Sequence, residues 1–205
     1  GVEVFVADLT DTNFNLEGFL DNTDILYNCS GEINDESLMQ KLHVTAVQRL
    51  IILSKGKVGR WVQLGSVGSY GNCRNGMITE NSNDKPVGGY ETTKTESDNL
   101  VRESGMQYVI LRPSNVFGLT MSNQSLFNLV NMVQKKIFFY IGISGSLVNY
   151  VHVNDVVEAL IQCGIDDKAL GNVFNISQIT TTERMIESFQ KGMGVKSSFF
   201  RLPEK

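Results

Sequence analysis

Short runs of apolar and β-branched residues alternate along the chain with longer segments whose apolar residues recur at helical spacing. Runs that end at turn residues predict strands, and an apolar residue every three or four positions predicts a helix. The predicted strands are Val2–Ala7, Asp24–Cys29, Arg60–Leu64, Gln107–Leu111, Leu147–Val153 and Asn172–Ile176. The predicted helices are Ser37–Leu53, Tyr90–Ser104, Ser122–Lys136, Asn154–Cys163 and a segment that opens at the capping box Thr180-x-x-Glu183.

Strands that alternate with helices predict an α/β fold, with a mainly parallel sheet covered by helices on both faces. In such sheets, ligands bind beyond the carboxyl ends of the strands. Chemistry is therefore expected in the residues that follow the strands, which are Asp8, Asn28–Gly31, Gly65–Ser69 and Arg112–Asn115. We expect Asn154 to cap its helix and Gly164 to lie just beyond the end of that helix.

The composition narrows the classes of function. The chain has 205 residues, of which 41% are hydrophobic and 20% charged, and its formal net charge is −4. A negative charge argues against binding to a nucleic-acid backbone. The longest apolar run, Ile137–Ile143, is too short to span a bilayer, and no signal peptide is visible. The sequence therefore favours neither a nucleic acid nor a membrane as partner.

Cysteine and histidine usage limits the chemistry further. The cysteines Cys29, Cys73 and Cys163 are odd in number and form no CxxC pattern, as expected in a reducing compartment such as the cytoplasm. His43 and His152 lack ligand spacing, so no metal site is predicted. The sequence also lacks a GxSxG elbow, which disfavours a Ser-His-Asp hydrolase.

A glycine motif follows the strand Arg60–Leu64. Gly65, Gly68 and Gly71 spell G-x-x-G-x-x-G, a spacing that suggests a dinucleotide-phosphate loop. Such a loop works only where it opens a helix, and the residues after Gly71 are polar and loop-like. The motif is better interpreted as a tight turn that presents Ser66.

A second motif is Tyr90-x-x-x-Lys94, whose side chains share one helix face about one turn apart. A nearby ammonium stabilises a phenolate and lowers the tyrosine pKa, which makes proton transfer to or from an alcohol oxygen feasible. By spacing alone, a solvated helix face is the simpler interpretation of this pair.

The order of these motifs resembles the NAD-dependent epimerase/dehydratase family of the extended short-chain dehydrogenase/reductase superfamily. The resemblance implies a Rossmann-like fold that is incomplete at its N-terminus, because the family begins with a strand, a Gly-rich phosphate loop, a helix and a second strand. This chain starts at what resembles the third strand. The similar segments are Val4–Asp11, Asp24–Gly31, Trp61–Gly71, Tyr90–Lys94, Leu111–Gly118, Tyr150–Leu160 and Gly171–Ser177.

The resemblance also implies a domain division. Residues 1–118 would form a partial dinucleotide-binding domain. Residues 119–205 would form a mixed segment, with further Rossmann elements at about 147–177 and a small C-terminal part that binds substrate.

The family's site residues carry over by resemblance. Tyr90 would be the general acid/base, Lys94 would bind the nicotinamide ribose and lower the pKa of the tyrosine, and Ser66 would hydrogen-bond the reacting oxygen. The other positions would contact cofactor or substrate: Asp8 and Leu9 the adenine, Asn28, Cys29, Ser30 and Pro113 the ribose and nicotinamide, and Asn115 the substrate.

The implied function is that of an NAD(P)-dependent nucleotide-sugar epimerase. Alternatives are a reductase of a ketosugar or other carbonyl compound, and a catalytically silent, truncated member that acts in binding or assembly. The run Ser66-Val67-Gly68 stands where 4,6-dehydratases usually show Thr-Asp-Glu, which disfavours a dehydratase. His43 stands where the family often has an Asn that supports a proton relay. The sugar, and the choice between NAD and NADP, stay open.

A homodimer is a further implication. The helices Ser37–Leu53 and Tyr90–Ser104 correspond to those that family members commonly pair as a four-helix bundle across a two-fold axis. Leu100 and Val101 are apolar residues on the second helix, although packing in the core explains them equally well.

The first prediction concerns the affinity for the cofactor. The glycine turn and helix N-terminus that hold a pyrophosphate do not occur in these residues, so electrostatic capture of a dinucleotide is lost. We expect the chain alone to bind NAD(H) and NADP(H) more weakly than ~1 mM, which is under about 4 kcal/mol. Calorimetric titration measures this, and a low micromolar dissociation constant would contradict it.

Overall fold

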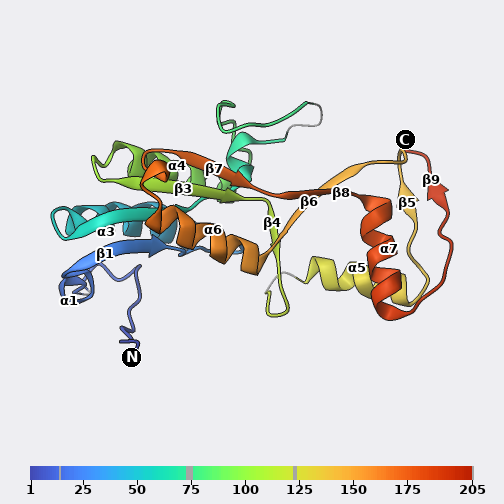
Figure 1. Cartoon of the computed structure of the whole chain (residues 1–205), viewed down its shortest axis with the longest axis horizontal. Coiled ribbons are helices and arrows are strands. Elements are labelled where there is room, and N and C mark those ends of the chain that lie inside the picture. The colour runs from blue at the N-terminus through green and yellow to red at the C-terminus, as the bar shows by residue number, and fades with distance from the viewer. Residues whose placement is uncertain (14, 73–75, 122–123, 205) are drawn as a thin grey trace. The chain divides into compact units, whose positions relative to one another are not determined.

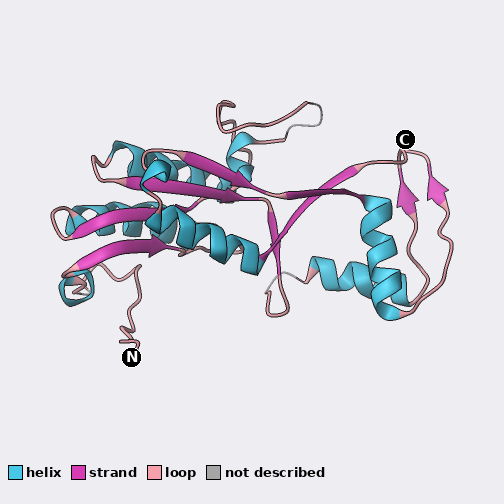
Figure 2. Ribbon diagram, viewed as in Figure 1, coloured by secondary structure: helices cyan, strands magenta, loops and turns pink. Residues whose placement is uncertain are grey.

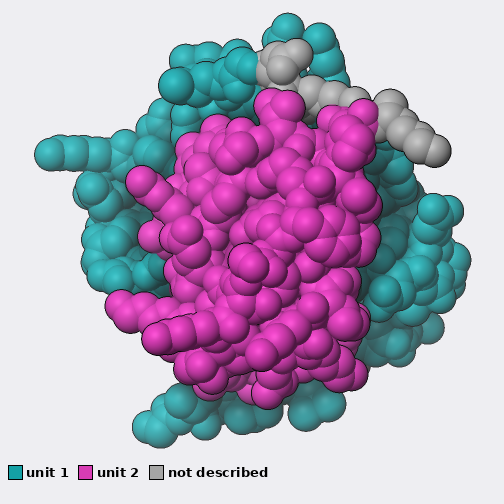
Figure 3. All heavy atoms as spheres, turned by 90° about the vertical axis from the view of Figure 1, so that its right-hand side faces the viewer, with its two compact units in different colours: residues 1–114, 154–176 teal, residues 115–153, 177–205 magenta. Residues whose placement is uncertain are grey.

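The computed structural model describes residues 1–13, 15–72, 76–121 and 124–204. Cys73, and Ser122 at the start of a predicted helix, lie outside the described residues. The chain divides into two compact units, which Figure 3 colours separately. The first unit comprises residues 1–114 and 154–176, and the second comprises residues 115–153 and 177–205.

The first unit is built on a parallel sheet with the strand order β1-β2-β3-β7 (Figures 1 and 2). This confirms the predicted α/β fold. Its strands are β1 (Thr23–Asn28), β2 (Val58–Leu64), β3 (Tyr108–Pro113) and β7 (Val173–Ile176). Its helical elements are α1 (Glu17–Leu20), α2 (Glu36–Met39), the π-helical η1 (Gln40–Thr45), α3 (Ala46–Ser54), the 3-10 turn η2 (Val67–Tyr70), α4 (Gly89–Glu103), α6 (Val153–Ile165) and the 3-10 turn η3 (Asp167–Ala169).

Helices cover both faces of this sheet. Leu26 of β1 is buried in a cluster with Leu50 of α3 and Val101 of α4. The next residue, Tyr27, points to the opposite face, because successive side chains alternate along a strand. There its hydroxyl lies so close to α6 that a Cβ added to Gly164 would be 2.0 Å from it.

The inward face of α4 is unusually polar. Its buried residues are Thr93, Lys94, Thr95, Ser97, Asp98 and Val101. Buried polar groups cost free energy unless they find partners, so this helix must exchange hydrogen bonds with the strands it covers. Val101, an apolar residue considered for a dimer contact, is fully buried in the core and is not available at the surface.

The predicted strand Val2–Ala7 is wrong. These residues form no strand, and Val2, Val4 and Val6 are 93%, 77% and 86% exposed. A strand persists only when its backbone groups pair, and none of the described strands pairs with this segment. The alternation of apolar residues is typical of a strand, but the segment has no partner strand in the described residues and therefore does not form one.

The predicted ends of two helices also need correction. Asn154 and Gly164 lie within α6 instead of flanking it. The last carbonyls of α6 are bound by the Arg60 guanidinium, whose Nη1 donates to the Gly164 oxygen at 2.5 Å and to the Asp166 oxygen at 3.1 Å, so a glycine cap is not needed. The final helix is capped by Thr181, not Thr180, since the Thr181 hydroxyl accepts the backbone N–H of Arg184.

The second unit contains two small sheets, β4-β6-β8 and β5-β9, with α5 and α7. Its elements are β4 (Asn115–Phe117), α5 (Ser125–Gln134), β5 (Tyr140–Ile141), β6 (Leu147–His152), β8 (Gln178–Thr181), α7 (Thr182–Met193) and β9 (Arg201–Leu202). The helices pack through a cluster that contains Val133, Phe138 and Ile186. In the part of the chain that the structure describes, no helix is long and apolar enough to cross a membrane.

The second prediction compares two glycines with positive φ. Gly71 combines φ 74° with ψ −163°, and a Cβ there would lie 2.0 Å from the Lys85 carbonyl oxygen. Gly105 has φ 76° but open space around it. We expect Gly71→Ala to lower the free energy of unfolding by about 2 kcal/mol or more, and Gly105→Ala by about 1 kcal/mol. Urea unfolding measures both, and equal losses would contradict the clash at Lys85.

Candidate active site

The carboxyl end of β2 leads into the turn that carries Ser66. The Gly65 N–H donates to the Leu111 oxygen of β3 at 2.8 Å, which continues the ladder one residue beyond the strand. Ser66 then caps η2, and its Oγ accepts the Gly68 N–H at 3.1 Å. The glycine motif opens only this four-residue 3-10 turn. It therefore lacks the helix N-terminus that a phosphate loop needs.

Tyr90 lies in the first turn of α4 and is half-buried. Its ring meets the His43 imidazole edge-on, with centroids 5.7 Å apart and an interplanar angle of 82°. Burial raises the pKa of Tyr90, the Glu91 carboxylate adds to this, and a side-chain hydrogen bond with Ser66 acts in the opposite direction. The structure thus brings Ser66 and Tyr90 together.

Lys94 lies one turn further along α4 and is 4% exposed. Its Nζ donates to the Leu64 carbonyl oxygen, the last residue of β2, at 2.6 Å. Burial lowers the pKa of Lys94, while the charges of Asp98 and Cys29 raise it. Lys94 therefore ties the helix that carries Tyr90 to the strand end that precedes Ser66.

The direction of the Tyr90 pKa differs from the expected one. The resemblance implies that Lys94 lowers it, whereas in the structure the pKa of Tyr90 is raised above its ordinary value, first by burial and then by Glu91. The physical reason is that burial disfavours the charged phenolate, and the neighbouring Glu91 carboxylate disfavours it further.

The end of β1 holds three of the positions expected near a cofactor. The Asn28 amide is buried and donates to the Gln63 Oε1 at 2.9 Å, and its own oxygen accepts the Ser30 hydroxyl at 2.7 Å. Its side chain thus shapes the strand end. Cys29 lies between them as an exposed residue. Partial shielding of its sulfur from water raises the pKa of the thiol, and the charge of Lys94 acts to lower it.

The remaining expected positions are spread over the chain. Asp8 accepts the backbone N–H and the hydroxyl of Thr10, while Leu9 packs against the core cluster. Pro113 ends β3 and pairs in register with Ile176. Asn115 opens β4 in the second unit, where its Nδ2 donates to the Asn149 oxygen at 3.2 Å.

His43 lies in η1 and is buried. Its Nε2 accepts the Glu32 backbone N–H at 2.9 Å, which leaves the proton of the neutral ring on Nδ1, 2.8 Å from the Thr93 hydroxyl. Thr93 in turn lies within hydrogen-bond distance of the Gly89 oxygen at 2.9 Å. Burial, aided by Lys94, lowers the pKa of His43 to about 4.

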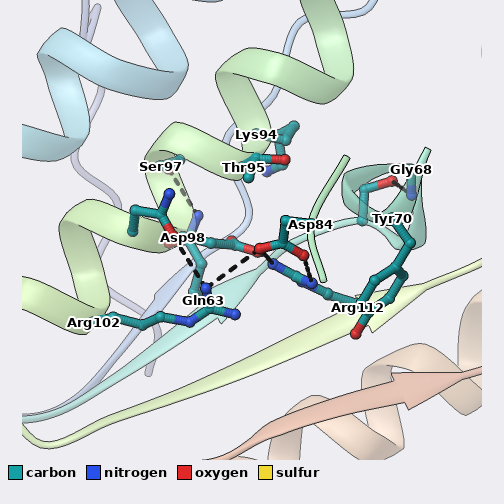
Figure 4. A network of polar contacts seen from close by, with 12 residues as sticks. Gln63, Gly68, Tyr70, Asp84, Lys94, Thr95, Ser97, Asp98, Arg102 and Arg112 are labelled. Carbon is teal, nitrogen blue, oxygen red and sulfur yellow. Dashed lines mark hydrogen bonds and ion pairs between the residues drawn. The ribbon is translucent and has the colours of Figure 1, made fainter. Parts of the chain in front are cut away.

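A network of buried charges next to Lys94 was not anticipated from the sequence (Figure 4). Arg112 of β3 donates from Nε to Asp98 at 2.9 Å and from Nη1 and Nη2 to Asp84 at 2.7 and 3.0 Å. Asp98 follows Lys94 by four residues on α4, so the same spacing that joins Tyr90 and Lys94 could have revealed it. Arg112 was expected only as one of the residues that follow a strand, and its pairing with Asp98 and Asp84 was not.

These residues fit the nicotinamide end of a dinucleotide better than a metal. The Ser114 hydroxyl, next to Pro113, is buried and has no hydrogen-bond partner among the described residues, as expected of a group kept for a ligand. Lys94, at the half-buried end of β2, has further N–H donors besides the one bound by the Leu64 oxygen. No group of His, Cys, Asp and Glu in the described parts of the chain is suited to hold a metal ion.

A doubly wound parallel sheet with Ser66, Tyr90 and Lys94 gathered at its carboxyl edge defines the class of short-chain dehydrogenase-like proteins. The family model described as "NAD dependent epimerase/dehydratase family" matches residues 2–177. The chain belongs to this family, whose members are NAD-dependent enzymes. Comparison with curated proteins gives no match.

Solved structures share the fold at low identity. UDP-glucuronic acid 4-epimerase from Bacillus cereus, in complex with NAD, has 19% identity and a TM-score of 0.79 over 96% of this chain and 68% of that one. UDP-N-acetylglucosamine 4-epimerase from Methanobrevibacter ruminantium M1 has 19% identity and a TM-score of 0.75 over 97% and 69%. DesIV, a dTDP-glucose 4,6-dehydratase from Streptomyces venezuelae, has 20% identity and a TM-score of 0.76 over 97% and 66%.

The third prediction concerns the pH dependence that His43 introduces. Because its folded-state pKa is depressed from 6.5 to about 4, the unfolded chain binds more protons in that interval, and stability falls as the pH drops through it. We expect His43→Gln to reduce this loss of stability, measured by urea unfolding at several pH values. The control is His152→Gln, which removes the other histidine and should retain the effect of His43. An unchanged profile in His43→Gln would show that the imidazole is not buried in its neutral form.

Proposed function

We propose that this protein is an NAD-dependent nucleotide-sugar epimerase that works through Ser66, Tyr90 and Lys94. The observation that carries the proposal is the contact between α4 and the end of β2: the Lys94 Nζ donates to the Leu64 oxygen at 2.6 Å, two residues before Ser66, and Tyr90 lies one turn earlier on the same helix. Membership of the family supports the cofactor and the reaction class.

Tyr90 moves the proton in this proposal. As the phenolate, its side chain would take the proton of a sugar hydroxyl as the carbon is oxidised, and the phenol so formed would return a proton when the carbonyl is reduced. Bound NAD would accept the hydride and give it back. Ser66 hydrogen-bonds the reacting oxygen and keeps it in line with the Tyr90 oxygen. Burial raises the pKa of Tyr90, which favours the phenol that acts as the acid in the reduction.

Lys94 binds and orients. Its ammonium, anchored on the Leu64 oxygen at 2.6 Å, has donors left for ribose hydroxyls beside Tyr90. Asp8, Leu9, Asn28, Cys29, Ser30 and Pro113 stay proposed cofactor contacts, and Asn115 a proposed substrate contact. A homodimer also stays part of the proposal.

Nucleotide sugars are the proposed substrates. The similar structures include a UDP-glucuronic acid 4-epimerase and a UDP-N-acetylglucosamine 4-epimerase, which makes UDP-sugars the first compounds to assay. An epimerase interconverts its sugars with catalytic NAD and no net change in NADH, whereas a one-way reductase consumes NADH in proportion to product. The ratio of NADH consumed to product formed therefore separates the proposal from the reductase alternative.

The fourth prediction tests Tyr90. In the active protein, Tyr90→Phe should lower turnover by about 10²-fold or more, since a positioned acid/base contributes on that scale. Turnover is measured as conversion of a UDP-sugar with NAD present. Tyr108→Phe is the control, because Tyr108 lies at the opposite, amino end of β3 and should keep full turnover. Full activity in Tyr90→Phe would remove Tyr90 from the mechanism.

A further inference from the structure

Asp98 is the most deeply buried charged residue near the candidate site. It is fully buried on α4, and the Arg112 Nε donates to its Oδ2 at 2.9 Å. Its other oxygen, Oδ1, is buried and has no hydrogen-bond partner among the described residues. A half-satisfied buried carboxylate is costly, so its retention calls for a physical reason.

The nearby Lys94 explains why a buried carboxylate is useful here. Lys94 is also buried, and its burial disfavours the charged ammonium. Among the described residues, one hydrogen bond, to the Leu64 carbonyl, compensates the ammonium, and it does so only in part. Burial lowers the pKa of Lys94, and the carboxylate of Asp98 is the largest influence in the opposite direction, ahead of Cys29. His43, on the neighbouring η1, is neutral and adds no compensating charge.

The position of Asp98 is fixed from two sides. Arg112 is held by both oxygens of Asp84 at 2.7 and 3.0 Å and presents its remaining Nε to Asp98. On the other side, the carboxylate lies close to Gly65, where an added Cβ would be 2.8 Å from the Asp98 Oδ2 and 3.0 Å from its Oδ1. The carboxylate therefore lies against Gly65, the residue that joins Ser66 to Leu64, whose oxygen binds Lys94.

We propose that Asp98 is a positioning residue of this site: its carboxylate, fixed by Arg112 beneath Gly65, holds the Lys94 ammonium charged and in place on the end of β2. Tyr90, Lys94 and Asp98 then lie at i, i+4 and i+8 of one helix, and they act on Ser66, Leu64 and Gly65 at one strand end. The catalytic meaning of this arrangement rests on the proposed function, whereas the electrostatic link between Asp98 and Lys94 does not.

The charges that face Asp98 favour its ionised form. Burial raises the pKa of Asp98 above its ordinary value, and the cations Arg112 of β3 and Lys94 and Arg102 of α4 act to lower it, so they limit the effect of burial. The hydrogen bond from the Arg112 guanidinium is made to an oxygen that accepts, as a carboxylate does. The inference therefore requires a carboxylate, not a carboxylic acid, at neutral pH.

The experiment follows the titration of Lys94 by carbon-13 NMR of its Cε, with the signal assigned by its loss in Lys94→Arg. Asp98→Asn removes the charge but keeps an oxygen for the Arg112 Nε. We expect this variant to lower the pKa of Lys94 by about one pH unit or more, as loss of a close opposite charge does. Asp84→Asn is the matched control. It removes an equal charge from the same Arg112, but Asp84 is not among the groups that act on Lys94, so the titration should be unchanged.

An unchanged Lys94 titration in Asp98→Asn, or equal shifts in both variants, would overturn the inference. Should Asp98→Asn fail to fold, the carbon-13 signal of the Asp98 carboxyl in the unaltered protein decides, and a protonated group at pH 7 overturns the inference. In turnover assays, the alkaline limb of the pH profile should move to lower pH by the same amount in Asp98→Asn and stay in place in Asp84→Asn. A shifted titration with no change in that limb leaves the link intact and counts against the proposed role of Lys94.

Discussion

The contact on which the first unit depends is the seam between the polar face of α4 and the carboxyl ends of β2 and β3. Lys94 binds the Leu64 oxygen, Ser97 accepts the Gln63 amide at 3.0 Å, and Asp98 pairs with Arg112. An ordinary core helix would bury apolar residues here. Burying these polar ones costs free energy that each partner must offset, and removing one partner of a buried ion pair costs about 3–5 kcal/mol. The seam therefore fixes the helix to the strands in one register, which sets the positions of Tyr90 and Ser66.

Most of this fold could be predicted because its elements carry their own signals. The apolar runs Asp24–Cys29 and Arg60–Leu64 correspond to the strands β1 and β2 of the structure, and Gly105 stops α4 as expected. Val2–Ala7 has the same alternation yet forms no strand, because strand formation depends on a neighbour that a local pattern cannot report. The predicted end of α6 was wrong for a related reason. The group that binds its last carbonyls is Arg60, about a hundred residues away along the chain.

In the candidate site, too, local patterns could be predicted from the sequence, whereas contacts between distant residues could not. Tyr90 and Lys94 could be paired from their spacing, and Ser66 from its place after a strand. Arg112 and Asp84 could not, since their partnership joins a strand to a loop that has no pattern of its own. His43 was visible as a departure from the family, but its role was not. Only the structure shows both ring nitrogens engaged, by the Glu32 N–H and the Thr93 hydroxyl. A ring so engaged, with its pKa lowered to about 4 by burial, is neutral at pH 7 and links η1 to α4 through Thr93.

The contact between α4 and the strand ends also explains why glycines occupy the turn after β2. Gly65 leaves room for the Asp98 carboxylate, and at Gly68 a Cβ would lie 2.8 Å from the Glu91 side chain. Both neighbours belong to α4, so the absence of side chains lets the helix that carries Tyr90 approach the strand end that carries Ser66. The spacing that suggests a phosphate loop is thus explained by packing. In the described structure, a glycine-rich turn after a strand serves to bring a polar helix against that strand, and the candidate catalytic residues face one another across this contact.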